Sequence, residues 1–162
     1  MRPVHFILLT SFLFFSCKKD NLAGGKLEIY LLKSYQLVPG KCQVNGDSAV
    51  LEETALVNND DILRYHKKEY QFTLTDSSML KIKALMDRTP FALTVNRKVV
   101  YYGIVKPIYS SSTCFHSITM DYVFPNGKIT MSLGYPGGGT NIDDQRNNPI
   151  LLAALKSQGK LR

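Results

Sequence analysis

The strongest structural signal in this chain lies in residues 69–108, EYQFTLTDSSMLKIKALMDRTPFALTVNRKVVYYGIVKPI. Apolar and polar side chains alternate over Glu69–Thr75, which predicts a strand with one buried face. The apolar residues of Asp76–Met86 then recur at helical spacing behind a Thr-Asp cap, which predicts a helix. Two more strands are expected over Phe91–Val95 and Val99–Ile108, joined by a tight Asn-Arg-Lys turn. The order strand, helix, hairpin is typical of an α+β domain.

The flanking segments add further elements to this unit. An apolar, β-prone run predicts a strand over Lys26–Ser34, and residues 118–133 predict a second hairpin around a Pro-Asn-Gly turn. Residues 49–57 are ambiguous between a short helix and an extended segment. A short helix with an Asn/Asp cap is expected at Asn59–Tyr65. A last helix is expected over Ile150–Ser157, because an Asn-Pro pair precedes it and a glycine follows it.

These elements predict one domain over residues 26–162. We expect a single α+β fold, a mainly antiparallel sheet of about five or six strands with two or three helices on one face. The stretches YQFTLTDSSMLKIK and PFALTVNRKVVYYGIVKPI, within residues 70–108, resemble the periplasmic head domain of SecD, a protein-export membrane component. Asn96-Arg97 stands where that family has an Asp-Gly turn. The resemblance implies a shared α+β arrangement and does not imply export activity.

The N-terminus has the pattern of an export signal. Arg2 is followed by a short apolar run over Phe6–Phe15 and then by Ser16-Cys17. This arrangement resembles the signal of bacterial lipoproteins, in a relaxed form of the lipobox because Phe14-Phe15 replaces the usual Leu and small residue. The resemblance implies that residues 1–16 are removed and that Cys17 receives the lipid. A transmembrane helix is not expected, because the apolar run is too short to span a membrane. Plain secretion, without the lipid, is therefore the main alternative.

Export would determine which binding partners are available to the rest of the chain. Residues 17–25 would form a flexible tether, and the membrane, reached through the lipid on Cys17, would be the first partner. The net charge falls from +7 for the whole chain to +6 after cleavage, because Arg2 is the one charged residue within 1–16. The basic residues are scattered, and we expect no nucleic-acid partner. The predicted location is the cell envelope, on the periplasmic or outer-surface face of a bacterial membrane.

The two remaining cysteines, Cys42 and Cys114, are expected to pair in an oxidising compartment. Such a disulfide would close a long loop and stabilise the fold by roughly 4 kcal/mol in the chain-entropy model. The alternative uses free thiols: Cys114 and His116 share a face of an extended segment and would suit a nucleophile pair or a metal site. We expect the disulfide, with no metal, no cofactor and no catalytic residue.

Aromatic and acidic residues provide a candidate binding surface. Tyrosines offer stacking faces and hydroxyl groups, as a polysaccharide or peptide ligand would require. The acids at the end of the Gly-rich loop could bind a hard cation or form a solvated turn. The candidate surface consists of Tyr101, Tyr102, Tyr109, Tyr135, Asp143 and Asp144.

The sequence therefore predicts a lipid-anchored, non-catalytic binding module for an envelope protein or polysaccharide. The alternative is an envelope hydrolase or metal-dependent enzyme that uses Cys114 and His116, or the Asp143-Asp144 loop. A scaffold subunit that pairs through an exposed edge strand is a third possibility.

Overall fold

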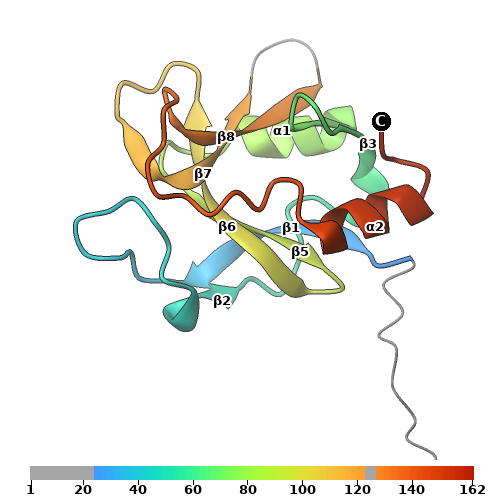
Figure 1. Ribbon diagram of the computed structural model, residues 1–162, viewed down its shortest axis with the longest axis horizontal. Coiled ribbons are helices and arrows are strands. Elements are labelled where there is room, and N and C mark those ends of the chain that lie inside the picture. Colours follow the sequence, from blue (N-terminus) through green and yellow to red (C-terminus); the bar gives the residue numbers. More distant parts are fainter. Residues whose placement is uncertain (1–23, 123–126) are drawn as a thin grey trace, which may run out of the picture.

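The computed structural model describes residues 24–122 and 127–162. Within these residues the chain forms one sheet and two α-helices (Figure 1). The expected signal peptide, the lipidation at Cys17, most of the tether and the turn of the second hairpin lie outside the described residues. The strands are β1 (Leu27–Ser34), β2 (Val50–Leu51), β3 (Ile62–His66), β4 (Gln71–Leu74), β5 (Pro90–Val95), β6 (Lys98–Pro107), β7 (Cys114–Tyr122) and β8 (Lys128–Tyr135), and the helices are α1 (Asp76–Lys83) and α2 (Pro149–Ser157).

The strand count of five or six was wrong: the described part of the chain forms an eight-stranded sheet in the order β2-β1-β5-β6-β7-β8-β4-β3. The two end strands account for the difference. β2 comes from the segment that was ambiguous in the sequence. β3 replaces most of the helix expected at Asn59–Tyr65, where only a short 3₁₀ turn, Asn59–Asp61, forms behind its Asn58 capping box. The predicted cap is therefore present, but it caps a single 3₁₀ turn and not the longer helix that was expected.

Pairing with distant residues explains why β3 is a strand. It lies antiparallel to β4 on one side. On the other side the C-terminus runs alongside it: the Tyr65 N–H donates to the Lys160 carbonyl, and the Arg162 N–H donates to the Tyr65 carbonyl, both at 2.8 Å. Ile62 and Tyr65 are fully buried. These contacts outweigh the weak local preference for a helix.

The central elements were predicted correctly. α1 starts at the Thr75 cap, whose side chain accepts a hydrogen bond from the Ser78 N–H. β5 and β6 form the expected hairpin. Asn96 and Arg97 both have positive φ (51° and 63°), as a two-residue hairpin turn with the twist of the strands requires. The Arg97 guanidinium donates to two backbone carbonyls of the segment that follows β2, which holds the turn in place.

The sheet is mainly antiparallel, and the β6–β7 pair is the parallel exception. Gly103 lies opposite Ile118, and Pro107 lies opposite Tyr122. A parallel connection commonly needs about a dozen or more residues, usually with a helix. Here only residues 108–113 separate the two strands. The chain therefore doubles back over one face of the sheet in a short crossover, without a helix.

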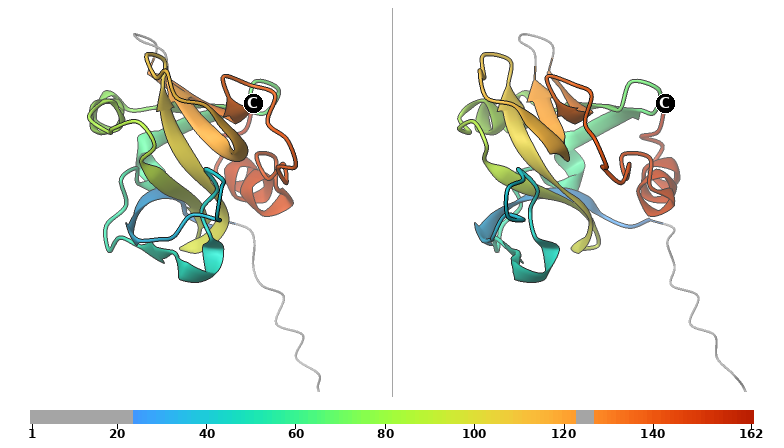
Figure 2. Two further views of the ribbon diagram at one scale, coloured as in Figure 1. Left: turned by 90° about the vertical axis from the view of Figure 1, so that its left-hand side faces the viewer. Right: turned by 60° about the vertical axis from the view of Figure 1, so that its left-hand side comes forward.

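The sheet is strongly curled (Figure 2). The side chains of the main core lie on its other face. β5 places Phe91, Leu93 and Val95 in it, and both helices add their buried side chains to the same cluster. The two α-helices of the described residues agree with the expected number of two or three. A smaller cluster on the crossover side contains Leu32, Val44, Ala92, Ile104 and Cys114. The structure describes no helix in residues 24–122 and 127–162 that has the length and apolarity to cross a membrane.

A substitution at Gly103 would test the packing at the point where β5, β6 and β7 meet. A Cβ at this position would lie 2.3 Å from Phe91 Cζ and 2.8 Å from the Ile118 carbonyl oxygen. We expect Gly103→Ala to lower the free energy of unfolding by about 3 kcal/mol, because neither neighbour can move without disturbing the core. Urea denaturation would measure this change.

Gly46→Ala is the matched control. Its Cβ would approach only the Tyr102 ring, at 3.2 Å, in a surface loop. We expect a change of less than about 1 kcal/mol. Equal losses for the two variants would contradict the packing described for Gly103.

Candidate functional site

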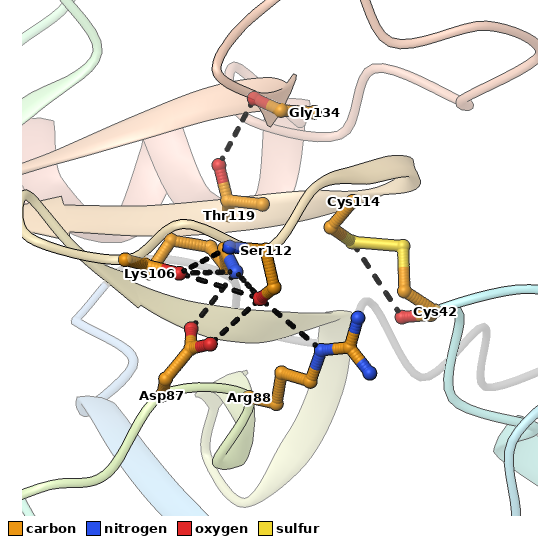
Figure 3. Close-up of a disulfide and its surroundings, with 9 residues drawn as sticks. Cys42, Asp87, Arg88, Lys106, Ser112, Cys114, Thr119 and Gly134 are labelled. Carbon is orange, nitrogen blue, oxygen red and sulfur yellow. Dashed lines mark hydrogen bonds and ion pairs between the residues drawn. A yellow bond between two sulfur atoms is a disulfide. The ribbon is translucent and has the colours of Figure 1, made fainter.

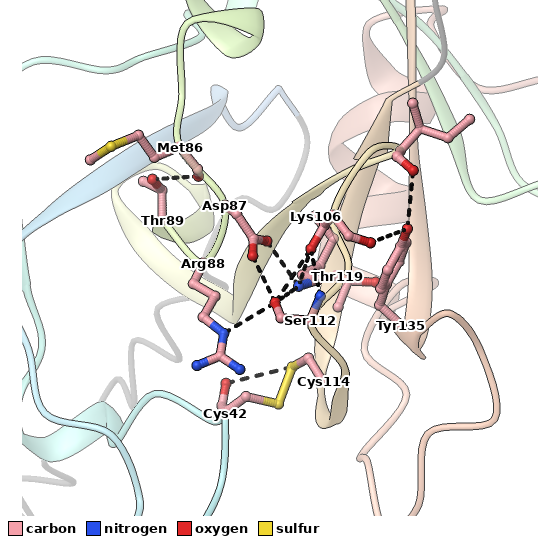
Figure 4. A network of polar contacts seen from close by, with 12 residues as sticks. Cys42, Met86, Asp87, Arg88, Thr89, Lys106, Ser112, Cys114, Thr119 and Tyr135 are labelled. Atoms are coloured by element: carbon pink, nitrogen blue, oxygen red, sulfur yellow. Dashed lines mark hydrogen bonds and ion pairs between the residues drawn. A yellow bond between two sulfur atoms is a disulfide. The ribbon is translucent and has the colours of Figure 1, made fainter.

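Lys106 is a buried cation on the crossover side of the sheet (Figure 4). Its neighbour Val105 packs in the main core, so the alternation of β6 directs Lys106 to the opposite face. The side chain is 0% exposed. Nζ donates to Asp87 Oδ1 at 2.8 Å, Ser110 Oγ at 2.8 Å and Ser112 Oγ at 2.6 Å. Three acceptors satisfy the three protons of the ammonium group.

Asp87, in the loop between α1 and β5, supplies the countercharge. Its second carboxylate oxygen accepts a hydrogen bond from Ser112 Oγ at 2.7 Å. Burial raises the pKa of the Asp87 carboxyl, but the hydrogen bonds from Lys106 and Ser112 lower it by more, so that the pKa lies below its usual value. Asp87 therefore stays ionised, and its negative charge is balanced by Lys106 inside the fold.

Tyr135 completes this network from β8. Lys106 Nζ lies 5.0 Å from the centre of the Tyr135 ring, within the range of a cation–π contact. The Tyr135 hydroxyl is 3.2 Å from the Ser110 carbonyl and 3.3 Å from the Ile108 carbonyl, to which it can donate. The crossover of residues 108–113 is therefore held by β6, β8 and the loop after α1.

The Cys42–Cys114 disulfide pins a second loop to the end of the crossover (Figure 3). The expected pairing is confirmed. The bond joins residues 72 apart in the sequence and ties loop 35–48 to the start of β7. Within this loop Pro39-Gly40 forms the turn, with Gly40 at φ +72°. The 3.8 Å approach of Cys114 Sγ to the Cys42 carbonyl is a contact, because a disulfide sulfur carries no proton.

A cleft of about 510 Å³ lies between these two loops. Its walls are residues 37–42 on one side and residues 113–116 on the other, with Ile104 and Arg88 completing the lining. The lining contains leucine, valine, isoleucine, phenylalanine and the disulfide, together with Lys41, Arg88 and His116. No aspartate or glutamate lines it. The cleft is apolar with a cationic rim, and its volume is in the range of small-ligand sites.

Arg88 is the cation that the fold places most firmly at this rim. Its backbone is left-handed (φ +66°), a strained conformation for a residue other than glycine. Its N–H donates to the Val105 carbonyl at 3.0 Å, and its side-chain Nε donates to Ser112 Oγ at 3.3 Å. Figures 3 and 4 show its guanidinium group on the side of Ser112 that faces the disulfide.

The structure separates the tyrosines that sequence reasoning grouped as one surface. Tyr101 is 6% exposed and belongs to the main core, and the small part that it exposes lines a hollow beside Tyr102. Tyr135 is half-buried in the Lys106 network. Tyr109, on the crossover, is 71% exposed. Tyr102 is half-buried beside loop 35–48.

The two acids of the Gly-rich loop have different surroundings. Asp144 forms a two-pronged ion pair with Arg146, and its pKa is lowered by the hydrogen bond from that guanidinium. Asp143 accepts a hydrogen bond from the Gln145 amide and lines a smaller hollow of about 170 Å³ with Tyr102. His116 lines both this hollow and the larger cleft. The structure therefore brings Tyr101, Tyr102 and Asp143 together at this hollow, which neither Tyr109 nor Tyr135 lines.

The side chains considered for catalysis are not assembled as a reactive set. The Cys114 sulfur is bonded to Cys42 and is not a free thiol. Within residues 24–122 and 127–162, no three His, Cys, Asp or Glu side chains cluster as ligands for a metal ion. Ser112 Oγ lies 2.6 Å from Lys106 Nζ, but a lysine base must be neutral, and Lys106 is paired with an ionised Asp87.

Sequence reasoning missed Asp87, Arg88 and Lys106. Lys106 carried a weak signal, since it is a lone charge at the end of the apolar strand VVYYGIVKP. Arg88 and Asp87 carried none, because a charged pair after a helix is ordinary in a loop. Their position depends on the β6–β7 pairing and on the crossover, which no local pattern indicates.

Comparisons with known proteins identify no relatives. No family model matches the chain, and no curated protein or solved structure is significantly similar to it. The resemblances to bacterial lipoproteins and to the SecD head domain therefore stay predictions. The crossover, the disulfide and the cleft are the features of the structure that bear on function.

The Lys106–Asp87 pair should contribute strongly to stability. We expect Asp87→Asn to lower the free energy of unfolding at pH 7 by about 3 kcal/mol, because it leaves a buried ammonium without a countercharge. Adding Lys106→Met should restore most of the loss, since the double variant has no buried charge. Urea denaturation of the three proteins measures both effects. A double variant less stable than Asp87→Asn would contradict the role assigned to the charge.

The same pair should shape the stability of the protein in acid. The folded-state pKa of Asp87 lies below the unfolded value of about 3.9, so its contribution is present above that pH and is lost as the pH falls through the folded pKa. The free energy of unfolding of Asp87→Asn should therefore fall less steeply below pH 4 than that of the parent. Urea titrations between pH 2 and pH 7 would show this difference, and parallel curves would rule it out.

Proposed function

We propose that this chain is a lipid-tethered cell-envelope protein whose folded domain is a non-catalytic binding module. The ligand site would be the cleft beside the Cys42–Cys114 disulfide. The observation that carries the proposal is the cleft itself, which is apolar, cationic at its rim and framed by two anchored loops. Anchored loops limit the conformational entropy that is lost when a ligand binds.

The position of the cleft suits a tethered protein. The described chain begins at Gly24, next to the end of α2: the Gly24 N–H donates to Ser157 Oγ at 3.0 Å, and the Gln158 amide donates to the Gly25 carbonyl at 2.8 Å. Loop 35–48, which forms one wall of the cleft, lies on the far side of the molecule (Figure 1). A lipid on Cys17 would therefore attach the domain at the end opposite the cleft.

The disulfide also supports an exported protein. Stable disulfides are common in extracytoplasmic compartments and rare in the cytosol. The pair uses both cysteines that follow the proposed lipidated residue, so that no unpaired thiol would remain in the mature chain.

An envelope hydrolase is the alternative function. It would need a nucleophile or a metal site, and the described residues provide neither a free thiol at Cys114 nor a ligand cluster. The Ser112–Lys106 contact is better explained as structural, because the Ser112 hydroxyl donates its hydrogen bond to Asp87 while Lys106 is ion-paired. We therefore favour binding over catalysis.

The tether can be tested directly in a bacterial host. We expect the full chain to fractionate with membranes and to yield an N-terminal peptide that begins at Cys17 and carries acyl chains, as mass spectrometry would detect. Cys17→Ala should abolish the acylated peptide, because the thiol that accepts the lipid is absent. Cys42→Ser is the matched control and should still be acylated. An unmodified Cys17 in the parent would contradict the anchor.

A further inference from the structure

We infer that the cleft binds a small organic acid, with its apolar body against Ile104 and Phe115 and its carboxylate on Arg88. This inference rests on the proposed function, because it names the ligand class for the same cleft. Three features of the site support it: the sign of its charge, the apolar surface it exposes, and the lack of an ion-pair partner for Arg88 among the described residues.

The charge of the lining favours an anion. Lys41, Arg88 and His116 supply hydrogen-bond donors, and no acidic side chain lines the cleft. The neighbouring smaller hollow differs, since Asp143 lines it. The two cavities share His116 and differ in charge, so an anionic ligand should distinguish between them.

The apolar surface favours a ligand with a hydrophobic body. Leu37 is 45% exposed and Phe115 is 38% exposed, on opposite walls of the cleft. Ile104 is buried with the disulfide residue Cys114 in the smaller apolar cluster. A ring between these walls would remove apolar area from water on both of its faces, which is the main favourable term in such a site.

Arg88 is available to a ligand because the nearby acid is already neutralised. Asp87, its neighbour in sequence, is committed to Lys106 and Ser112. Among the residues that the structure describes, the ion pairs are Lys106–Asp87 and Arg146–Asp144, and neither includes Arg88. Only Nε of its guanidinium has a protein partner in this region, Ser112. The outer nitrogens keep the paired donor geometry that matches a carboxylate.

The test uses a matched pair of ligands, indole-3-acetate and indole-3-acetamide, which have the same indole body and differ in one group, an anionic carboxylate or a neutral amide. The chain contains no tryptophan, so indole fluorescence reports the ligand alone. Full-length protein in detergent micelles is titrated while the anisotropy of each ligand is recorded, with empty micelles as the blank. Arg88→Gln removes the proposed anion partner, and Arg64→Gln, an exposed arginine on β3, is the matched control.

We expect the parent protein to bind the acetate about tenfold more tightly than the acetamide, the effect of one charge-assisted hydrogen-bonded pair. Arg88→Gln should reduce acetate affinity about tenfold and leave acetamide affinity unchanged, and Arg88→Lys should retain part of the preference. Arg64→Gln should change neither value. Thermal melts of each variant confirm that it is folded.

Two results would overturn the inference in different ways. Equal affinity for the two ligands, unaffected by Arg88→Gln, would reject the organic acid but keep the cleft as a binding site. Failure of both ligands to bind the folded parent protein would reject the cleft itself, and with it the proposed function.

Discussion

The buried Lys106 ammonium is the constraint on which the arrangement of the site depends. β6 and β7 are parallel neighbours, yet only residues 108–113 separate them, so the chain must return across the face of the sheet. That return buries a lysine, and an unpaired buried charge would be too costly to keep. Asp87, Ser110 and Ser112 supply its three acceptors. The crossover and the loop after α1 are thereby fixed relative to each other.

The cleft follows from this arrangement. Fixing Asp87 also fixes Arg88, which reaches the rim through a left-handed backbone and a hydrogen bond to Ser112. The crossover ends at Cys114, where the disulfide attaches loop 35–48 and sets the opposite wall. The charges are divided between two tasks: Lys106 neutralises Asp87 inside the fold, and Arg88 remains for a ligand. A stability feature and a binding feature therefore share one network.

Sequence patterns predicted what depends on neighbours along the chain. α1, the β5–β6 hairpin and α2 follow from caps, alternation and turn residues, and the disulfide follows from cysteine counting. Local sequence predicts a helix where β3 forms, because the capping signal is local, whereas the partners of β3 lie in residues 71–74 and 160–162. The cleft was missed for the same reason: residues 37–42, Arg88 and residues 113–116 meet only after non-local pairing. The entropic cost of bringing such distant segments together cannot be inferred from any one short segment of the sequence.

The most direct test of the account is to map a bound acid on the folded protein by nuclear magnetic resonance. We expect indole-3-acetate to shift the amide signals of residues 37–42, Arg88 and residues 113–116 in ¹⁵N-labelled protein, and to leave those of residues 142–145, beside the smaller hollow, unchanged. The Arg88 side-chain Nε–H signal should shift with the same dissociation constant as the amide signals. Shifts centred on residues 142–145, or an Arg88 signal that does not move at saturation, would contradict binding of the acid at Arg88.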